Sequence, residues 1–179
     1  LGFSVWVDTY KMFVSKIKAP KHYTWKQAIG KLSLHTKLVW VITSILLITG
    51  FMVIFLVEYN NPATLGALSF KEKIYAALFQ SVSPRTAGFN TVSLADLTDT
   101  SKLYTIVLMF IGGSPAGTAG GIKTVTFLVL VATAISVIRN RRSANVFGRQ
   151  IAEEAIRKAV GVFVMSFCVV AVSTILLSY

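Results

Sequence analysis

One run of five residues carries groups that could bind a cation through the backbone. The run is Thr86, Ala87, Gly88, Phe89 and Asn90. It contains no carboxylate, so a bound cation would have to be held by carbonyl oxygens. Gly88 can adopt left-handed backbone angles that turn successive carbonyls to one side. A ring of such carbonyls can replace the hydration shell of an ion, so we expect the ion-binding groups to be the carbonyls of this run.

A short helix must position this run. Ser69 and Glu72 have the spacing of a capping box, and Pro84 ends the apolar pattern, so we expect a helix over 69–83 and a filter loop over 84–91. A helix of some 14 residues is only about 21 Å long, too short to cross a bilayer. We expect it to enter the membrane and turn back, which places its partially negative C-terminus deep in the membrane, where it favours a cation. The alternative is an amphipathic helix on the surface.

Charged residues next to this run need a separate explanation. Arg85 lies beside the expected cation path, and we expect its guanidinium to point behind the filter, towards a carboxylate or carbonyls, as a structural brace. The alternative role is a barrier that limits conduction. Asp96 and Asp99 could concentrate cations at the outer mouth. We favour a solvated loop in which Asp99 or Ser101 caps the next helix.

A second candidate element interrupts the hydrophobic stretch from Lys102 to Ile138. An unbroken helix of these 37 residues would be about 55 Å long, too long for one span without a large tilt. The break at 112–121 consists of Gly112, Gly113, Ser114, Pro115, Ala116, Gly117, Thr118, Ala119, Gly120 and Gly121. Such a composition disfavours helix, and irregular backbone at this depth must line a cavity or be buried in protein. We interpret the break as a gate below the filter.

Two alternatives apply to the same stretch. Gly113, Gly117 and Gly121 have the four-residue spacing of closely packed membrane helices. The segment from Gly117 to Lys123 also approaches a phosphate-binding loop, but Ile122 replaces the required glycine. A loop is favoured over both. Lys123 is costly inside a membrane, so we expect it to support the gate, either by snorkelling or by hydrogen bonding to the loop carbonyls.

Composition indicates a membrane protein. Of 179 residues, 54% are hydrophobic and 14% are charged, whereas soluble domains carry about 25% charged residues. Residues 38–57 contain no charge and would form a helix of roughly 30 Å, the thickness of a hydrocarbon core. Residues 159–179 form a second uncharged stretch. We therefore expect an all-α membrane protein and no enzymatic activity.

The net charge of +11 is distributed unevenly. Seven lysines lie within residues 11–37 and six basic residues within 139–158, whereas four basic and four acidic residues balance over 58–102. Basic loops on one side of hydrophobic spans place 11–37 and 139–158 in the cytoplasm. This distribution indicates membrane topology, and we do not expect nucleic acid as a partner.

The expected order of segments follows from these features. Residues 1–19 end a preceding membrane helix and 20–37 form a cytoplasmic linker. The first span at 38–58 is followed by the short helix, the filter and a broken span at 102–138. The basic stretch at 139–158 is a cytoplasmic linker or short helix, and 159–179 form the next span. The abrupt ends suggest an internal piece of a longer protein.

Two pairs of motifs carry a resemblance to a known family. SPRTAGFNT at 83–91 and GGSPAGTAGGIKT at 112–124 resemble the third pore repeat of the Trk/Ktr/HKT potassium transporter superfamily. LGFSVWVD near the start and KLSLHTKLV at 31–39 resemble the bacterial Ktr-type membrane subunit. The resemblance implies four repeats, each of M1, pore helix, filter loop and M2, around one pore. This chain would hold the third repeat with a broken M2, flanked by parts of its neighbours.

The resemblance also implies a function. It implies potassium uptake, often assisted by Na⁺, with K⁺ coordinated around Ala87 and Gly88, and with 112–121 as the gating loop. It implies a multi-pass protein of the bacterial plasma membrane, homodimeric, on a cytoplasmic ring of nucleotide-binding (RCK) regulatory subunits. No cofactor is expected in this chain beyond the transported ion.

Other functional classes stay open on sequence grounds. A secondary transporter with a broken helix would bind its substrate at the midplane of the membrane. A structural membrane scaffold would not conduct at all. Within the favoured interpretation, selectivity and gating fall on different stretches, and we expect each to be testable without the other.

Overall fold

The chain is helical, with one very short strand pair. In the computed structural model, the described residues are 2–18, 25–140, 145–146 and 149–178. Their helices are α1 (Phe3–Lys18), α2 (Trp25–Gly30), α3 (Leu34–Glu58), α4 (Phe70–Val82), α5 (Asp99–Phe110), α6 (Thr124–Ile138) and α7 (Glu153–Leu177). Strands β1 (Asn145–Val146) and β2 (Arg149–Gln150) pair antiparallel. The expected all-α class is confirmed apart from this two-residue ladder.

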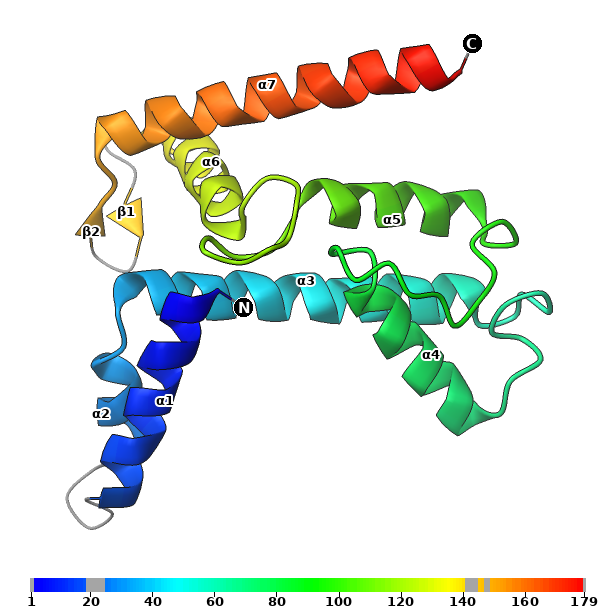
Figure 1. Ribbon diagram of the computed structural model, residues 1–179, viewed down its shortest axis with the longest axis horizontal. Helices are drawn as coiled ribbons and strands as arrows, with labels where there is room; N and C mark the ends of the chain where they lie inside the picture. Colours follow the sequence, from blue (N-terminus) through cyan, green and yellow to red (C-terminus); the bar gives the residue numbers. More distant parts are fainter. Residues whose placement is uncertain (1, 19–24, 141–144, 147–148, 179) are drawn as a thin grey trace.

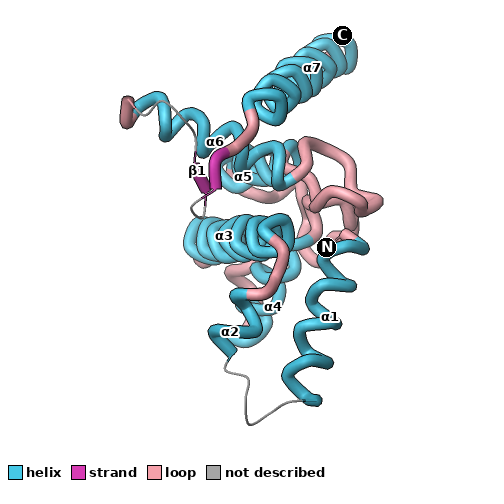
Figure 2. Tube along the Cα trace, turned by 90° about the vertical axis from the view of Figure 1, so that its left-hand side faces the viewer, coloured by secondary structure: helices cyan, strands magenta, loops and turns pink. Residues whose placement is uncertain are grey.

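Helix α3 is the element on which the others are arranged. Figure 1 shows α4 below its second half, α5 above it and the α1–α2 pair hanging from its first half. Helix α7 runs in the same direction as α3, and the two lie on opposite sides of α6. Figure 2 looks along α3 and shows the same layers from the side. By length and composition, α3 and α7 are the two described helices able to cross a membrane.

Two apolar clusters join the layers. In the first, Ile42 and Leu46 of α3 pack against Leu108 and Ile111 from the end of α5. The second contains Ile54, Leu65, Ala76 and Ala77, and links α3 to α4. Most large apolar side chains of α7 remain exposed, which fits a surface that faces lipid or other protein.

A buried carboxylate fixes the C-terminal end of α3. Glu58 is fully buried and its oxygens accept hydrogen bonds from Asn61 Nδ2 and Thr64 Oγ1, each at 2.7 Å. The same carboxylate accepts from the amide and hydroxyl of Thr98, at 3.0 and 2.6 Å. Because Thr98 is the N-cap of α5, this network holds the end of one long helix to the start of another.

The helices do not begin at the expected segment bounds. Helix α3 begins at Leu34, because Ser33 caps it, so the end of the expected linker at 20–37 is helical. Helix α7 begins at Glu153, so residues 153–158 belong to it and not to the linker at 139–158. Glu153 and Glu154 lie in the first turn of α7, where the positive end of the helix dipole favours negative charge. They pair with Arg157 and Lys158, each four residues further on. Residue 19 of the expected helix end, and the expected linker segments at 20–24, 141–144 and 147–148, lie outside the described residues.

Candidate functional site

Helix α4 leads the chain from the end of α3 to its middle. Near the start of α4, Lys73 Nζ donates to the carbonyl of Tyr59 at 2.8 Å. Near its end, Ser81 lies so close to Gly50 that a Cβ on Gly50 would be 3.0 Å from the Ser81 Cβ. The start of α4 thus lies at the end of α3, and the end of α4 lies near the middle of α3. The loop after α4 is therefore about halfway along α3 (Figure 1).

The sequence determines the length of α4. The expected capping box is present: the Glu72 carboxylate accepts from the amide of Ser69, while the Ser69 hydroxyl interacts with the N3 position. The helix ends at Val82, and its C-cap Ser83 keeps helical angles, with φ of -58° and ψ of -42°, although Pro84 follows it. With 13 residues, α4 is about 20 Å long, which is too short to cross a membrane.

The run at 86–90 forms a tight turn over Ser83. The Ser83 carbonyl accepts from the amides of Ala87 and Gly88, at 3.0 and 3.1 Å. Thr86 and Gly88 have left-handed φ angles of 76° and 77°. Ala87, between them, is not among the residues of positive φ. The backbone therefore alternates in hand over these three residues.

This turn leaves its carbonyls free. Among the described residues, no hydrogen bond reaches the carbonyl oxygens of Thr86, Ala87, Gly88 or Asn90. Phe89 differs, since its carbonyl accepts from the hydroxyl of Ser83. Four of the five carbonyls proposed as ion ligands thus have no competing donor within the described chain.

Thr86 is the strained member of the turn. A β-branched residue rarely adopts a positive φ, and such a conformation costs on the order of 1–3 kcal/mol. The Thr86 hydroxyl donates to the carbonyl of Arg85, which removes that carbonyl from the free set. Sequence reasoning identified Gly88 but gave no signal for the left-handed angle of Thr86.

The Gly-rich loop, residues 111–123, is closed at its base. Ile111 and Ile122 form a parallel bridge, and the amide of Ile122 donates to Phe110 at 2.9 Å. Further in, the amide of Thr124 donates to the carbonyl of Gly113 at 3.1 Å. The irregular segment separates α5 from α6, so the alternative of packed helices spaced by Gly113, Gly117 and Gly121 is wrong.

Glycines form the base of this loop because its two strands touch. A Cβ on Gly112 would lie 1.6 Å from the Gly120 carbonyl oxygen, and one on Gly113 would lie 2.6 Å from the Ala119 Cβ. Lys123 Nζ donates to the carbonyl of Ala119 at 2.5 Å, which is the second of the two expected arrangements for this lysine. The base is therefore a packed structure, in which glycine supplies close approach as well as freedom of angle.

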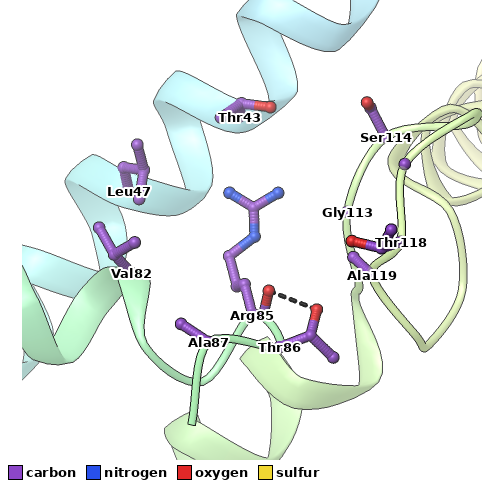
Figure 3. A pocket seen from close by; sticks show the side chains of 11 residues that line it. Thr43, Leu47, Val82, Arg85, Thr86, Ala87, Gly113, Ser114, Thr118 and Ala119 are labelled. Carbon is purple, nitrogen blue, oxygen red and sulfur yellow. Dashed lines mark hydrogen bonds between the residues drawn. The ribbon is translucent and has the colours of Figure 1, made fainter. Parts of the chain in front are cut away.

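The turn and the Gly-rich loop line one cavity of about 330 Å³. Its walls come from α3, from the end of α4 with the turn, and from the loop: Thr43, Leu47, Val82, Arg85, Thr86, Ala87, Gly113, Ser114, Gly117, Thr118 and Ala119. Figure 3 shows these residues around the Arg85 side chain. The two stretches expected to serve selectivity and gating therefore lie on different walls of one cavity, so a change in one alters a wall that the other shares.

Arg85 lies in this cavity, with its side chain directed away from Ala87 (Figure 3). Its Nη2 makes a long contact of 3.5 Å with the carbonyl of Gly112, and its Nε has no partner among the described residues. The guanidinium thus connects the turn to the base of the Gly-rich loop. Thr43, which lines the α3 wall, was not singled out in the sequence because a threonine in an apolar helix carries no distinctive signal.

The loop before α5 differs from expectation where the helix begins. Thr98, and not Asp99 or Ser101, is the N-cap, and its hydroxyl accepts from the amide of Ser101. Asp99 lies 3.9 Å from the Lys102 ammonium. Among the described residues, no group of three or more His, Cys, Asp or Glu side chains is arranged to hold a metal ion.

The fold and site define a helical membrane protein with three unusual features: a short helix after a long one, a turn whose carbonyls mostly have no donor among the described residues, and irregular backbone between α5 and α6. Comparison with known proteins agrees with this class. A family model described as TrkH, cation transport protein, matches residues 54–178. The chain belongs to the TrkH family, as the resemblance had implied.

Several curated proteins are similar to this chain. The Ktr system potassium uptake protein B of Bacillus subtilis is 41% identical over 138 residues, which cover 77% of this chain and 31% of that protein. The protein of the same name from Vibrio alginolyticus is 35% identical over 177 residues, covering 99% and 36%. The potassium/sodium uptake protein NtpJ of Enterococcus hirae is 33% identical over 174 residues, covering 96% and 35%. The chain spans about a third of the length of these relatives.

Proposed function

We propose that this chain is part of a potassium uptake pore in the bacterial plasma membrane, with the carbonyls of residues 86–90 as its filter. The observation that carries the proposal is the set of three successive carbonyls, at Thr86, Ala87 and Gly88, that accept no hydrogen bond from the described residues. Carbonyl oxygens can replace the water around K⁺, and those around Ala87 and Gly88 are the proposed site. The names of the relatives, potassium uptake protein and potassium/sodium uptake protein, support K⁺ as the ion and Na⁺ as an assisting one.

Depth within the membrane supports the same proposal. Leu47 and Thr43 line the cavity beneath the turn and lie 11 and 15 residues before Glu58, so the cavity is about 16–22 Å from the outer end of α3. At that depth the C-terminus of α4 contributes partial negative charge. Arg85 points away from the turn, and this orientation makes a brace a better role for it than a barrier in the ion path.

We propose that the Gly-rich loop is the gate. It lines the cavity under the turn, its base is closed by backbone hydrogen bonds, and its tip extends beyond that base. A fixed base with a projecting tip suits a constriction that can move without unfolding α5 or α6. Arg85 and Lys123 support the loop through the carbonyls of Gly112 and Ala119.

One such unit provides a single filter strand, so we propose that several units together surround the pore. The chain would supply one unit of M1, pore helix, filter and M2, with α1 and α7 belonging to neighbouring units of a four-unit pore. Its length, about a third of the relatives, fits this division. The word "system" in the names of two relatives supports additional subunits, for which a homodimer on a cytoplasmic nucleotide-binding ring is proposed.

The test of the filter is ion discrimination by the complete transporter in proteoliposomes. Gly88→Ser should lower the preference for Rb⁺ over Na⁺ by about fivefold or more, because a side chain disfavours the left-handed φ of 77° by about 1–2 kcal/mol. Gly161→Ser is the matched control, since no atom lies within 4 Å of a Cβ there. An unchanged preference in Gly88→Ser, at normal protein amounts, would exclude the filter assignment.

The gate is tested in the same vesicles. Deleting residues 115–118 removes only the tip, and should raise Rb⁺ uptake because it removes the constriction. Equal or lower uptake by a correctly inserted protein would count against the gate.

A further inference from the structure

The start of α1 lies against the tip of the Gly-rich loop, although the two segments are 112 residues apart in the chain. The amide of Gly2 donates to the hydroxyl of Ser114, and the amide of Phe3 donates to the carbonyl of Ala116 at 3.4 Å. Both acceptors, the Ser114 hydroxyl and the Ala116 carbonyl, belong to the tip of the Gly-rich loop. Figure 2 shows the start of the chain next to the loop segments of the molecule.

The contact requires glycine. A Cβ on Gly2 would lie 2.0 Å from the carbonyl oxygen of Pro115 and 2.8 Å from the hydroxyl oxygen of Ser114. The first of these is backbone, so no side-chain rotation can relieve it. A Cβ on Gly117, across the contact, would have the Cα of Gly2 as a neighbour at 3.9 Å. The start of α1 and the loop tip therefore meet backbone to backbone.

A second connection holds α1 to the start of α3. The Asp8 carboxylate accepts from the hydroxyls of Ser33 and Thr36, at 2.6 and 2.7 Å. Ser33 is the N-cap of α3, and Thr36 is fully buried in its first turn. Helix α1 is therefore attached at one point to a long, fixed helix and at another to the tip of a loop.

We propose that Gly2 and Ser114 form a latch through which the position of α1 sets the position of the Gly-rich loop. The proposal rests on the gating role proposed for that loop. While the latch is closed, the amides of α1 hold the tip under the 86–90 turn. Movement of the start of α1 about its attachment at Asp8 opens the latch and releases the tip. Because α1 ends in Lys16 and Lys18 on the side expected to face the cytoplasm, a cytoplasmic event has a direct route to the loop.

The first test uses Rb⁺ uptake by the complete transporter. Gly2→Ala should raise uptake about fivefold or more, because the added Cβ separates the tip from α1. Gly30→Ala is the matched control, with no atom within 4 Å of its Cβ. In a background lacking residues 115–118, Gly2→Ala should have no further effect. Unchanged uptake in Gly2→Ala, or an equal rise in both backgrounds, would overturn the latch.

A second test does not require the protein to fold with alanine in place of Gly2. In a Cys168→Ala background, Phe3→Cys with Ala116→Cys should form a disulfide that lowers uptake, and a reductant should restore it. Phe3 is largely exposed, so its replacement leaves the core intact. Ile17→Cys with Ala116→Cys, which uses the far end of α1, should not crosslink.

The outcomes distinguish failure of the latch from failure of the proposed gate. Failure of the 3–116 pair to crosslink, or a crosslink that leaves uptake unchanged, overturns the latch while the gate stands. If deletion of 115–118 alone leaves uptake unchanged although the 3–116 crosslink forms, the gate is overturned, and with it any effect of the latch on uptake.

Discussion

The 86–90 turn and the Gly-rich loop both depend on glycine, but for different physical reasons. At Gly88 a Cβ would meet no atom within 4 Å, yet φ is 77°, so the backbone angle requires glycine. At Gly112 φ is not positive, yet a Cβ would overlap the Gly120 carbonyl. Gly121 combines both requirements, with φ of 71° and crowding by the carbonyls of Met109 and Phe110.

Glycine therefore serves a different purpose in each of the two segments. In the turn, glycine allows a strained conformation that leaves carbonyls exposed, and the space around it is open. In the loop, glycine allows two backbone strands to pack at a distance that no side chain permits. A Gly-rich composition is therefore no evidence of flexibility in itself, since the base of this loop is its most crowded part.

The largest expected effect follows from crowding in the loop. Gly112→Ala should destabilise the complete transporter by about 1–3 kcal/mol or more, because the Cβ overlaps backbone that cannot rotate away. Thermal unfolding in detergent measures the effect, with Gly161→Ala as the control in open space. A Tm equal to that of the control would show that the base of the loop is loose, and would remove the contrast with the turn.

The second effect distinguishes the two reasons directly. Gly88→Ala should cost about 1–2 kcal/mol through the backbone angle, and Gly88→Asn should cost less, because asparagine tolerates left-handed angles better. At Gly112 the asparagine variant should be the less stable one, since asparagine is larger than alanine. The Tm of the alanine variant is compared with that of the asparagine variant at each site. An identical order at both sites would show that Gly88 and Gly112 are required for the same physical reason.

The smallest expected effect concerns α4, which positions the turn. The amide of Ser69, followed by its hydroxyl, lowers the pKa of Glu72 below its ordinary value of 4.5. The stabilisation from this cap is therefore present above about pH 4.5 and is lost as the pH falls through the lowered pKa. Glu72→Gln should flatten the fall in Tm over that range. The Gly-rich loop has no carboxylate, so an equal flattening in a variant of that loop would contradict this assignment.

Residues with strong local rules could be predicted from the sequence. Ser69 and Glu72 begin α4, and Pro84 follows its end, as the spacing indicated. The excess length after Lys102, together with five glycines and a proline, predicted a break between α5 and α6, and the structure has irregular backbone over 111–123. These features depend on a few neighbouring residues.

Features that depend on distant contacts could not be predicted. The positive φ of Thr86 is imposed by its surroundings, against the preference of a β-branched residue. The contact of Gly2 with Ser114 joins segments too far apart for any pattern to reveal. The helical start at Glu153 was missed because residues 139–158 were grouped by charge, although the acidic first turn and its pairs four residues on were present in the sequence.

The buried carboxylate of Glu58 has a consequence for the order of assembly. Its donor Thr98 is made 40 residues after it, which at about 5–20 residues per second is a delay of roughly 2–8 s. Until then, half of the Glu58 carboxylate lacks its final donors. The last donors to Glu58 therefore become available only after α4 and the 86–90 turn have been synthesised.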